Sequence, residues 1–259
     1  MKASQTACLS NLKQIGVAVN VYTTDNREKL PYGGIRYRNG AMSWDDLLNS
    51  YVGGAWTAGD IDGTIATARG LKQYMCPADK VRNTYNANNA RQTYSLPKLF
   101  NNTSATNAYS SVMQTGVGVL FDWGDTAGGW TNAWPAGGPT AGPPSNSSNV
   151  PRGDQLPAVR TSLVNAPTTT IMFTERIFSV GTQGLAFHSS TVSYPRHHIG
   201  YSDANDANLF GFKSEQLHGK DQYNYLFVDG HAEFLNWQVT TTTNRDDLQR
   251  GMWTINPTD

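Results

Sequence analysis

The sequence predicts an α+β fold, in which a long N-terminal helix packs on an antiparallel sheet and long loop insertions separate the strands. An apolar stripe with helical spacing runs through residues 1–26. A strong hairpin signal occupies residues 223–237, between two apolar runs. We therefore expect a single domain over 1–259, which consists of the helix, a loop-rich variable region with short strands at 27–165, and a C-terminal sheet at 166–259.

The opening helix is predicted by the spacing of its apolar side chains. Steps of four and three residues place the following side chains on one helical face: Cys8, Leu12, Ile15, Val19 and Tyr22. Polar residues that favour turns follow at 24–27, and Leu30-Pro31 cannot continue a helix. We expect the apolar stripe to be buried against the sheet.

Short apolar runs rich in β-forming residues predict the strands. Two of these runs, at 117–121 and 169–174, are expected to be central strands. Near the C-terminus, Asp229-Gly230 lies between alternating apolar runs and predicts a two-residue hairpin turn. In that register Phe227 pairs with Ala232 on the buried face, and the opposite face, which includes Leu226, is half exposed.

The composition is typical of an exported protein with a neutral polar surface. The chain has 20 Lys and Arg against 20 Asp and Glu, and only 15% of its residues are charged. A net charge of zero gives no indication of a nucleic-acid partner.

The chain has two cysteines, Cys8 and Cys76. In an oxidising compartment such a pair suggests a disulfide, which here would close a loop of about 68 residues and contribute about 4 kcal/mol. The alternative is two separate buried thiols, because a free cysteine behaves as a small apolar residue. No histidine lies near Cys76 in the sequence, so we do not expect a catalytic Cys–His pair.

The two ends of the chain together resemble a known family. The opening Cys8-Leu-Ser-Asn-Leu-Lys-Gln-Ile-Gly16 and the closing Tyr225-Leu-Phe-Val-Asp-Gly-His231 are similar to prepilin-like, type II secretion pseudopilin proteins that end in a His–nine residues–Asp-Gly element. Weaker similarities follow in the family's order at 44–51, at 75–79 with 93–95, and at 166–175, a predicted strand that ends in Glu175. The structural motif would consist of His218, Asp229, Gly230 and His231.

Two features depart from the family pattern. Ten residues, not nine, separate His218 from Asp229. Family members also begin with a leader and about twenty apolar residues that anchor them in the inner membrane, whereas this chain starts directly on the polar part of the helix. We therefore expect this chain to be a soluble truncation of a protein on the periplasmic side of the inner membrane or at the cell surface. The alternative is a natural soluble, secreted relative of the family.

The resemblance implies a pilin-like fold and a non-enzymatic role. The chain would be the periplasmic globular part of a membrane-anchored subunit of a type II secretion pseudopilus or a type IV pilus-like filament. Its partners would be other pseudopilin subunits, the secretion machinery and, through the missing segment, the inner membrane. The alternative is a secreted carbohydrate-binding or calcium-binding module.

Three groups of residues could bind a ligand. Side chains with oxygen ligands alternate at Asp60 and Asp62, and a second cluster of such side chains consists of Asp203, Asn205 and Asp206. Structural calcium is one interpretation of these clusters, and solvated turns are the other. A glycine- and proline-rich loop with three tryptophans is either a binding loop or a lid over the sheet: Trp123, Trp130 and Trp134.

The histidines lack the spacing of a zinc motif, so we expect no catalytic metal. The groups weighed for this role are His188, His197, His198, His218 and His231, with Glu175 and Asp229. His218 and His231 are expected to be hydrogen-bonded surface or loop residues. The sequence thus indicates no cofactor other than possible structural calcium, and no catalytic residue.

Overall fold

The structure is a computed structural model of the chain. It describes the following residues: 2–37, 40–61, 63–81, 86–97, 116–118, 120–122, 158–176, 181–184, 192–193, 217–219, 221–241 and 251–255.

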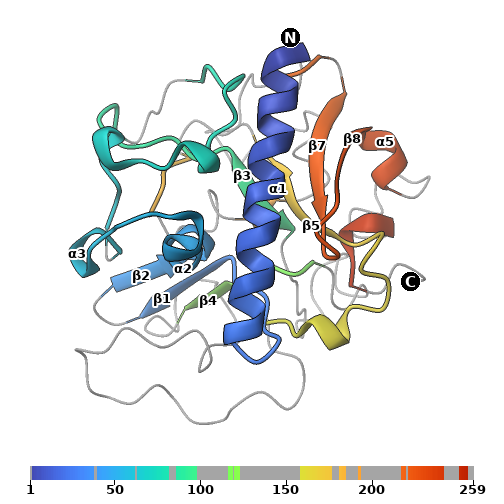
Figure 1. The fold of residues 1–259 in the computed structure, drawn as a ribbon, viewed down its shortest axis with the longest axis horizontal. Helices are drawn as coiled ribbons and strands as arrows, with labels where there is room; N and C mark the ends of the chain where they lie inside the picture. Colours follow the sequence, from blue (N-terminus) through green and yellow to red (C-terminus); the bar gives the residue numbers. More distant parts are fainter. Residues whose placement is uncertain are drawn as a thin grey trace, which may run out of the picture.

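The chain opens with the long helix α1, Lys2–Asp25, which runs across the sheet (Figure 1). The predicted apolar stripe is confirmed: its five side chains are all buried, with at most 2% of their surface exposed, namely Cys8, Leu12, Ile15, Val19 and Tyr22. Thr24 to Arg27 end the helix as expected, and Arg27 and Glu28 adopt positive φ angles of 56° and 63° in the turn that follows. The helix is thus amphipathic, and one face belongs to the core.

The main sheet has five strands in the order β6-β3-β5-β7-β8. Their bounds are Tyr94–Pro97 for β3, Ile171–Glu175 for β5, Val192–Ser193 for β6, Gln222–Phe227 for β7 and Ala232–Asn236 for β8. The four strands β3, β5, β7 and β8 are antiparallel, and β6 is parallel to β3. A long N-terminal helix on a largely antiparallel sheet makes the fold α+β. The strand expected at 169–174 is β5, two residues later at its start, and it lies in the centre of the sheet.

A second, smaller sheet was not anticipated. It has the order β2-β1-β4 and consists of β1 (Gly34–Tyr37), β2 (Gly40–Ser43) and β4 (Leu120–Asp122). The run at 117–121 was expected to supply a central strand of the antiparallel sheet, and this expectation is wrong. Among its described residues only 120 and 121 belong to a strand, β4, which pairs in parallel with β1 at the edge of the small sheet.

Short helices connect these strands. The α-helical ones are α2 (Trp44–Leu48), α3 (Ala58–Ile61) and α5 (Trp237–Thr240). The 3₁₀ turns are η1 (Ser50–Val52), η2 (Thr67–Arg69), η3 (Lys72–Tyr74), η5 (Thr161–Leu163) and η8 (Gly251–Trp253). Helix α2 begins with a capping box, in which Ser43 and Asp46 bond each other's backbone N–H groups.

The C-terminal hairpin forms where the sequence predicts it, but its register is wrong by one residue. Strand β7 pairs Leu226 with Ala232 and Tyr225 with Glu233. The loop has three residues because Val228 and Asp229 form an ordinary turn, in which the Gly230 N–H donates to the Phe227 carbonyl at 2.9 Å. Gly230 alone in this turn is left-handed, with φ 91°. A two-residue turn would also place Asp229 in the left-handed conformation; in the structure its φ is not positive, and its carboxylate accepts the His231 N–H at 3.1 Å.

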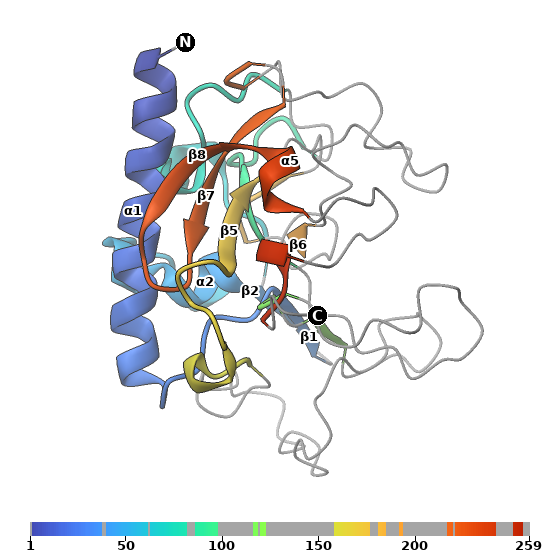
Figure 2. The same cartoon turned by 90° about the vertical axis from the view of Figure 1, so that its right-hand side faces the viewer.

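The corrected register changes which side chains face the helix. Leu226, expected to be half exposed, is fully buried on the α1 side, where an added Cβ on Gly16 would lie 3.0 Å from its Cδ1. Tyr225 faces the other way and meets Trp253 edge to face, with ring centroids 6.2 Å apart. Figure 2 shows the two coverings, with α1 on one side of the sheet and α5 with the C-terminal turn on the other. Strand β7 is therefore buried on both faces, which the alternation pattern of a half-buried strand does not anticipate.

Aromatic packing fills the space between the sheet and the connecting helices. Trp44 is fully buried and contacts both Tyr74 and Phe173 edge to face, at centroid distances of 4.9 and 4.8 Å. The Tyr74 hydroxyl donates to the backbone carbonyl of Asp45 at 3.1 Å. The segments that follow α1 are thereby fixed against the central strand β5.

Candidate functional site

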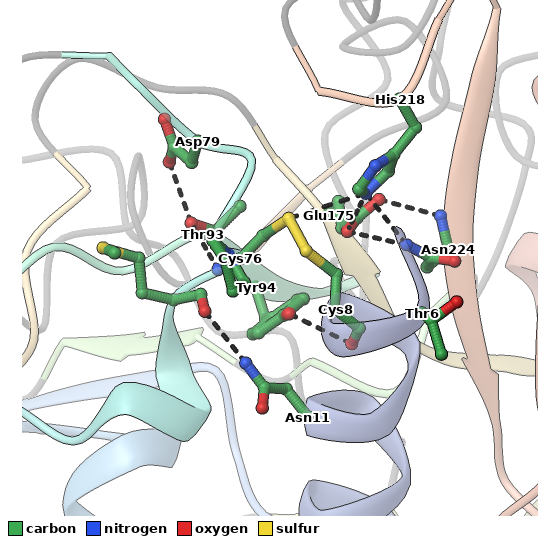
Figure 3. The surroundings of a disulfide bond; sticks show 12 residues. Thr6, Cys8, Asn11, Cys76, Asp79, Thr93, Tyr94, Glu175, His218 and Asn224 are labelled. Carbon is green, nitrogen blue, oxygen red and sulfur yellow. Dashed lines mark hydrogen bonds and ion pairs between the residues drawn. A yellow bond between two sulfur atoms is a disulfide. The ribbon is translucent and has the colours of Figure 1, made fainter. Parts of the chain in front are cut away.

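Four segments that are far apart in the sequence meet at one end of the sheet. Helix α1 supplies Cys8, the turn after η3 supplies Cys76, the end of β5 supplies Glu175, and the turn before β7 supplies His218 (Figure 3). One ligand atom from each of the four residues lies within 4.8 Å of all the others. We call these four residues the Cys–Glu–His cluster. All four are buried, and the side chains of His218 and Glu175 have no exposed surface.

Cys8 and Cys76 form a disulfide, with Cα atoms 4.8 Å apart. Both ends of the bridge are fixed by hydrogen bonds to strand β3 and the residue before it: the Cys76 N–H donates to Thr93 Oγ1 at 3.2 Å, and the Tyr94 hydroxyl donates to the Cys8 carbonyl at 3.2 Å. Burial raises the pKa of Tyr94 well above its ordinary value, with the negative charge of Glu175 adding to the effect, so its hydroxyl stays protonated as this bond requires. The bridge thus joins α1 to the sheet next to the buried carboxylate.

Glu175 is held by β7. The Asn224 backbone N–H donates to Glu175 Oε2 at 2.8 Å, and the Asn224 side-chain amide donates to Oε1 at 2.9 Å. The β5–β7 ladder sets this contact, because Thr174 pairs with Tyr225, and Glu175 and Asn224 are the adjoining residues of the two strands. A buried carboxylate needs such donors, since an unpaired one is costly.

His218 completes the cluster. Its Nε2 lies 2.9 Å from Glu175 Oε1, 3.0 Å from the Asn224 amide nitrogen and 3.5 Å from Cys76 Sγ. If Nε2 carries a proton, it can donate to the Glu175 carboxylate but cannot accept from the Asn224 amide. If it carries a lone pair, it can accept from the amide but cannot donate to Glu175. The Nδ1 atom of the same ring is buried and has no hydrogen-bond partner among the described residues. Nε2 of His218 therefore has more polar neighbours than it can hydrogen-bond at once, whereas Nδ1 has no hydrogen-bond partner among the described residues.

His218 was expected to be a hydrogen-bonded surface or loop residue. It lies in a turn and is hydrogen-bonded, but its side chain is fully buried instead of on the surface. Although no histidine is close to Cys76 in sequence, His218, 142 residues away, contacts its sulfur, which is part of the disulfide. The folding of the sheet, and not local spacing, brings the two together.

A second buried polar group adjoins the cluster. Asp79 accepts a hydrogen bond from Thr93 Oγ1 at 2.8 Å and pairs with Arg91 at 3.1 Å. Burial lowers the pKa of Arg91 from its ordinary value, while Asp79 partly compensates. Thr93 therefore connects this ion pair to the backbone of Cys76.

The other residues of the predicted motif lie at the opposite end of β7. His231 stacks on Phe227 with ring centroids 4.3 Å apart, and its Nδ1 lies 2.6 Å from Asp229 Oδ1. Glu233 approaches His231 Nε2 only to 3.7 Å. This group is partly exposed and does not join the Cys–Glu–His cluster. The two histidines of the motif thus have separate structural roles.

The predicted calcium and tryptophan groups, and three of the histidines, lie largely outside the described residues. The residues not described are Asp62, Asp203, Asn205, Asp206, Trp123, Trp130, Trp134, His188, His197 and His198. Asp60 is described, and its carboxylate is engaged by protein donors: Oδ2 accepts two bonds from Thr57 at 2.6 Å and Oδ1 pairs with Arg69. These bonds lower the pKa of Asp60, with the Thr57 hydroxyl the largest cause. Asp60 therefore stabilises the start of α3 in the way an N-terminal cap does.

Sequence reasoning missed Asn224. A signal was present, because Asn224 is a polar residue inside the otherwise apolar run Tyr223 to Val228 and follows His218 by six positions. A buried polar side chain in a strand needs a partner, and Glu175 is that partner here.

Comparisons with models of protein families, with curated proteins and with solved structures found no match to this chain. No helix among the described residues is both long enough and apolar enough to cross a membrane.

Proposed function

We propose that this chain is the globular part of a pseudopilin-like subunit that assembles into a filament through its N-terminal helix and performs no catalysis. The motif resemblance at the two ends of the chain motivates this proposal. The pilin-like identity of the fold is part of the same proposal.

The observation that supports it best is the position of α1. The helix lies along the edge of the molecule, with one stripe on the sheet and the remainder facing outward (Figure 2). Two large apolar side chains, Val17 and Val21, stand one turn apart on this outer face and are 65% and 49% exposed. A subunit that assembles helix against helix needs such an outer face.

The chemistry of the Cys–Glu–His cluster also supports a structural role. The side chains of its titratable groups, Glu175 and His218, have no exposed surface, which favours a structural role over catalysis. They connect the helix to three other segments of the chain. A cluster of this kind fixes the helix in place, which a filament subunit requires if its helix is to transmit contacts between neighbours.

The first experiment is to determine the N-terminal sequence and modification of the mature protein from its native cells by mass spectrometry. We expect an N-methylated hydrophobic residue that opens an apolar segment upstream of Lys2, in the membrane fraction. A mature protein released by an ordinary signal peptidase would overturn the proposal and direct attention to a secreted binding module.

The second experiment tests the outer face of the helix in the full-length protein. Val17→Glu combined with Val21→Glu should abolish filaments seen by electron microscopy, because it places charges in the proposed contact. The matched control is Val239→Glu, which changes a 58% exposed valine on α5 and should leave assembly intact. Equal assembly of both variants would contradict the proposed contact, provided that both are folded by circular dichroism.

A further inference from the structure

We propose that the reduced form of this protein binds one zinc ion through Cys8, Cys76, Glu175 and His218. The site does not depend on the filament role, because it follows from the Cys–Glu–His cluster alone.

The donor set is suited to zinc. Two thiolates, one imidazole and one carboxylate are the ligand types that Zn²⁺ takes in proteins, and four of them complete its tetrahedral shell. Calcium and magnesium prefer oxygen ligands only, so the thiolates disfavour both. Soft sulfur ligands in a tetrahedral arrangement with nitrogen select zinc among the common divalent ions.

The distances are close to what such a site needs. A tetrahedral zinc with bonds of about 2.0–2.3 Å places its ligand atoms about 3.3–3.8 Å apart. His218 Nε2 is already 3.5 Å from Cys76 Sγ and 2.9 Å from Glu175 Oε1, and all four ligand atoms lie within 4.8 Å of one another. Once the S–S bond is broken, the main change is the separation of the two sulfur atoms, which small rotations of both cysteine side chains provide.

The conflict at His218 Nε2 points to the same atom as the ligand. That nitrogen faces an acceptor on Glu175, a donor on Asn224 and a sulfur on Cys76, and one proton or one lone pair cannot serve all three. A cation between Nε2, Glu175 Oε1 and the sulfurs resolves the conflict: the lone pair binds the metal, and the carboxylate binds the same ion. The ring is then neutral, with its remaining proton on the buried Nδ1.

The surroundings resemble those of a closed structural site. Four protein ligands leave no position for water, and all four residues are buried. Asn224 orients Glu175 through two hydrogen bonds, and Thr93 accepts the N–H of Cys76. Neighbours of this kind orient metal ligands and raise metal affinity.

The switch between the two states is a thiol–disulfide exchange. A dithiol reductant transfers two electrons to the Cys8–Cys76 bond, which breaks to give two protein thiols, and the reductant leaves as its own disulfide. Zinc then binds both sulfurs as thiolates and releases two protons. In the reverse direction, an oxidising disulfide accepts two electrons, the S–S bond re-forms and the ion is expelled. The same cysteines thus hold α1 in place in either redox state.

The test uses the whole chain purified without a histidine tag, either oxidised or reduced with a phosphine, and incubated with zinc sulfate. After gel filtration, zinc is measured by mass spectrometry. We expect one zinc per reduced chain and none on the oxidised chain. X-ray absorption should find two sulfur ligands and two nitrogen or oxygen ligands, and cobalt in place of zinc should show thiolate charge transfer and tetrahedral visible bands.

Variants assign the ligands. His218→Ala and Glu175→Gln should each weaken zinc binding to the reduced chain, and Asn224→Ala should weaken it by about 10–100-fold by loosening Glu175. The matched control is His231→Ala, which removes another histidine that lies next to a carboxylate and should keep full binding. The affinity is read by competition with a chromogenic chelator.

Three outcomes would overturn the proposal: a reduced wild-type chain without zinc, a coordination shell with a different sulfur count, or zinc bound equally by the oxidised chain. If His218→Ala does not fold, the X-ray absorption and cobalt spectra of the wild-type chain still decide, because neither depends on a variant.

Discussion

Helix α1 and strand β7 meet at Gly16 and Leu226. A Cβ added to Gly16 would lie 3.0 Å from Leu226 Cδ1 and 3.4 Å from the Gly230 carbonyl oxygen. Leu226 is fully buried. Residues near the two ends of the chain are thus in direct contact, and the contact leaves little room for a side chain on the helix.

We expect Gly16→Leu to lower the free energy of unfolding by about 1–3 kcal/mol, because the new side chain overpacks the contact with Leu226. Leucine forms helices better than glycine, so a loss cannot come from helix propensity. Gly16→Ala should stay within about 1 kcal/mol of the wild type, since the gain in propensity opposes a tight contact with a flexible side chain. Val17→Leu, one residue along on the exposed face, is the control for urea denaturation and should change stability by less than about 0.5 kcal/mol.

The hairpin turn gives a second prediction. Gly230 has φ 91°, where any other residue is strained, so Gly230→Ala should cost about 1–2 kcal/mol in thermal or urea unfolding. An added Cβ would also lie 3.1 Å from the Asn20 amide nitrogen. Combining Gly230→Ala with Asn20→Ala separates the two causes, because the double variant relieves crowding but not backbone strain. Gly59→Ala, at a helical glycine with open space around it, should cause no loss. Full recovery in the double variant would contradict the strain argument.

The sequence predicts the elements of this fold better than their contacts. The stripe from Cys8 to Tyr22 is visible because helical spacing is a local signal, and all five side chains are buried. The hairpin is local too, but its register is not. A two-residue and a three-residue loop differ here in the conformation of Asp229 and in the hydrogen-bond partner of Val228. In the structure the Val228 N–H donates to the Thr170 carbonyl, in another part of the chain.

The Cys–Glu–His cluster was not predicted as a unit because its members come from four separate segments. The disulfide could be suggested from the cysteine count alone. Glu175 and His218 each had a place in the motif resemblance, but nothing local joins two residues that are 43 positions apart. Asn224 could have been noticed as a polar residue in an apolar strand, though its partner is set by the pairing of β5 with β7.

Asp45 should make stability depend on pH. Its fully buried carboxyl group has a raised pKa, mainly because burial disfavours the charge, with bonds from Ser43 and the Gly184 N–H opposing this. A raised folded-state pKa means that the native state binds the proton more tightly than the unfolded state. The resulting stability is present below the ordinary Asp pKa of 3.8 and is lost as pH rises through the folded-state pKa.

Asp45→Asn removes this dependence. We therefore expect the stability of the variant, relative to the wild type, to rise between pH 4 and 7 in urea unfolding. Asp60→Asn is a control of opposite sign, because Thr57 and Arg69 lower the pKa of Asp60. Its stability relative to the wild type should fall as pH rises through the acidic range to the ordinary pKa of 3.8, and should stay nearly constant above about pH 5. If the relative stability of Asp45→Asn does not rise with pH, the assignment to Asp45 is wrong.

The disulfide gives the last prediction. Closing a loop between residues 68 positions apart restricts the unfolded chain, which corresponds to about 4 kcal/mol on the chain-entropy estimate. We expect a phosphine reductant to lower the free energy of unfolding of the wild-type chain by up to that amount in the presence of a metal chelator. The chelator is needed because zinc bound to the reduced chain would return part of the loss. Cys8→Ala with Cys76→Ala should show the same loss without reductant and no further change with it.

A smaller loss in the wild type than in the double variant, with the chelator present, would mean that the reduced thiols still stabilise the cluster through His218 and Glu175. If neither reduction nor the double substitution lowers stability, the buried stripe of α1 and the hydrogen bonds of Asn11 and Tyr94 hold the helix in place without the bridge.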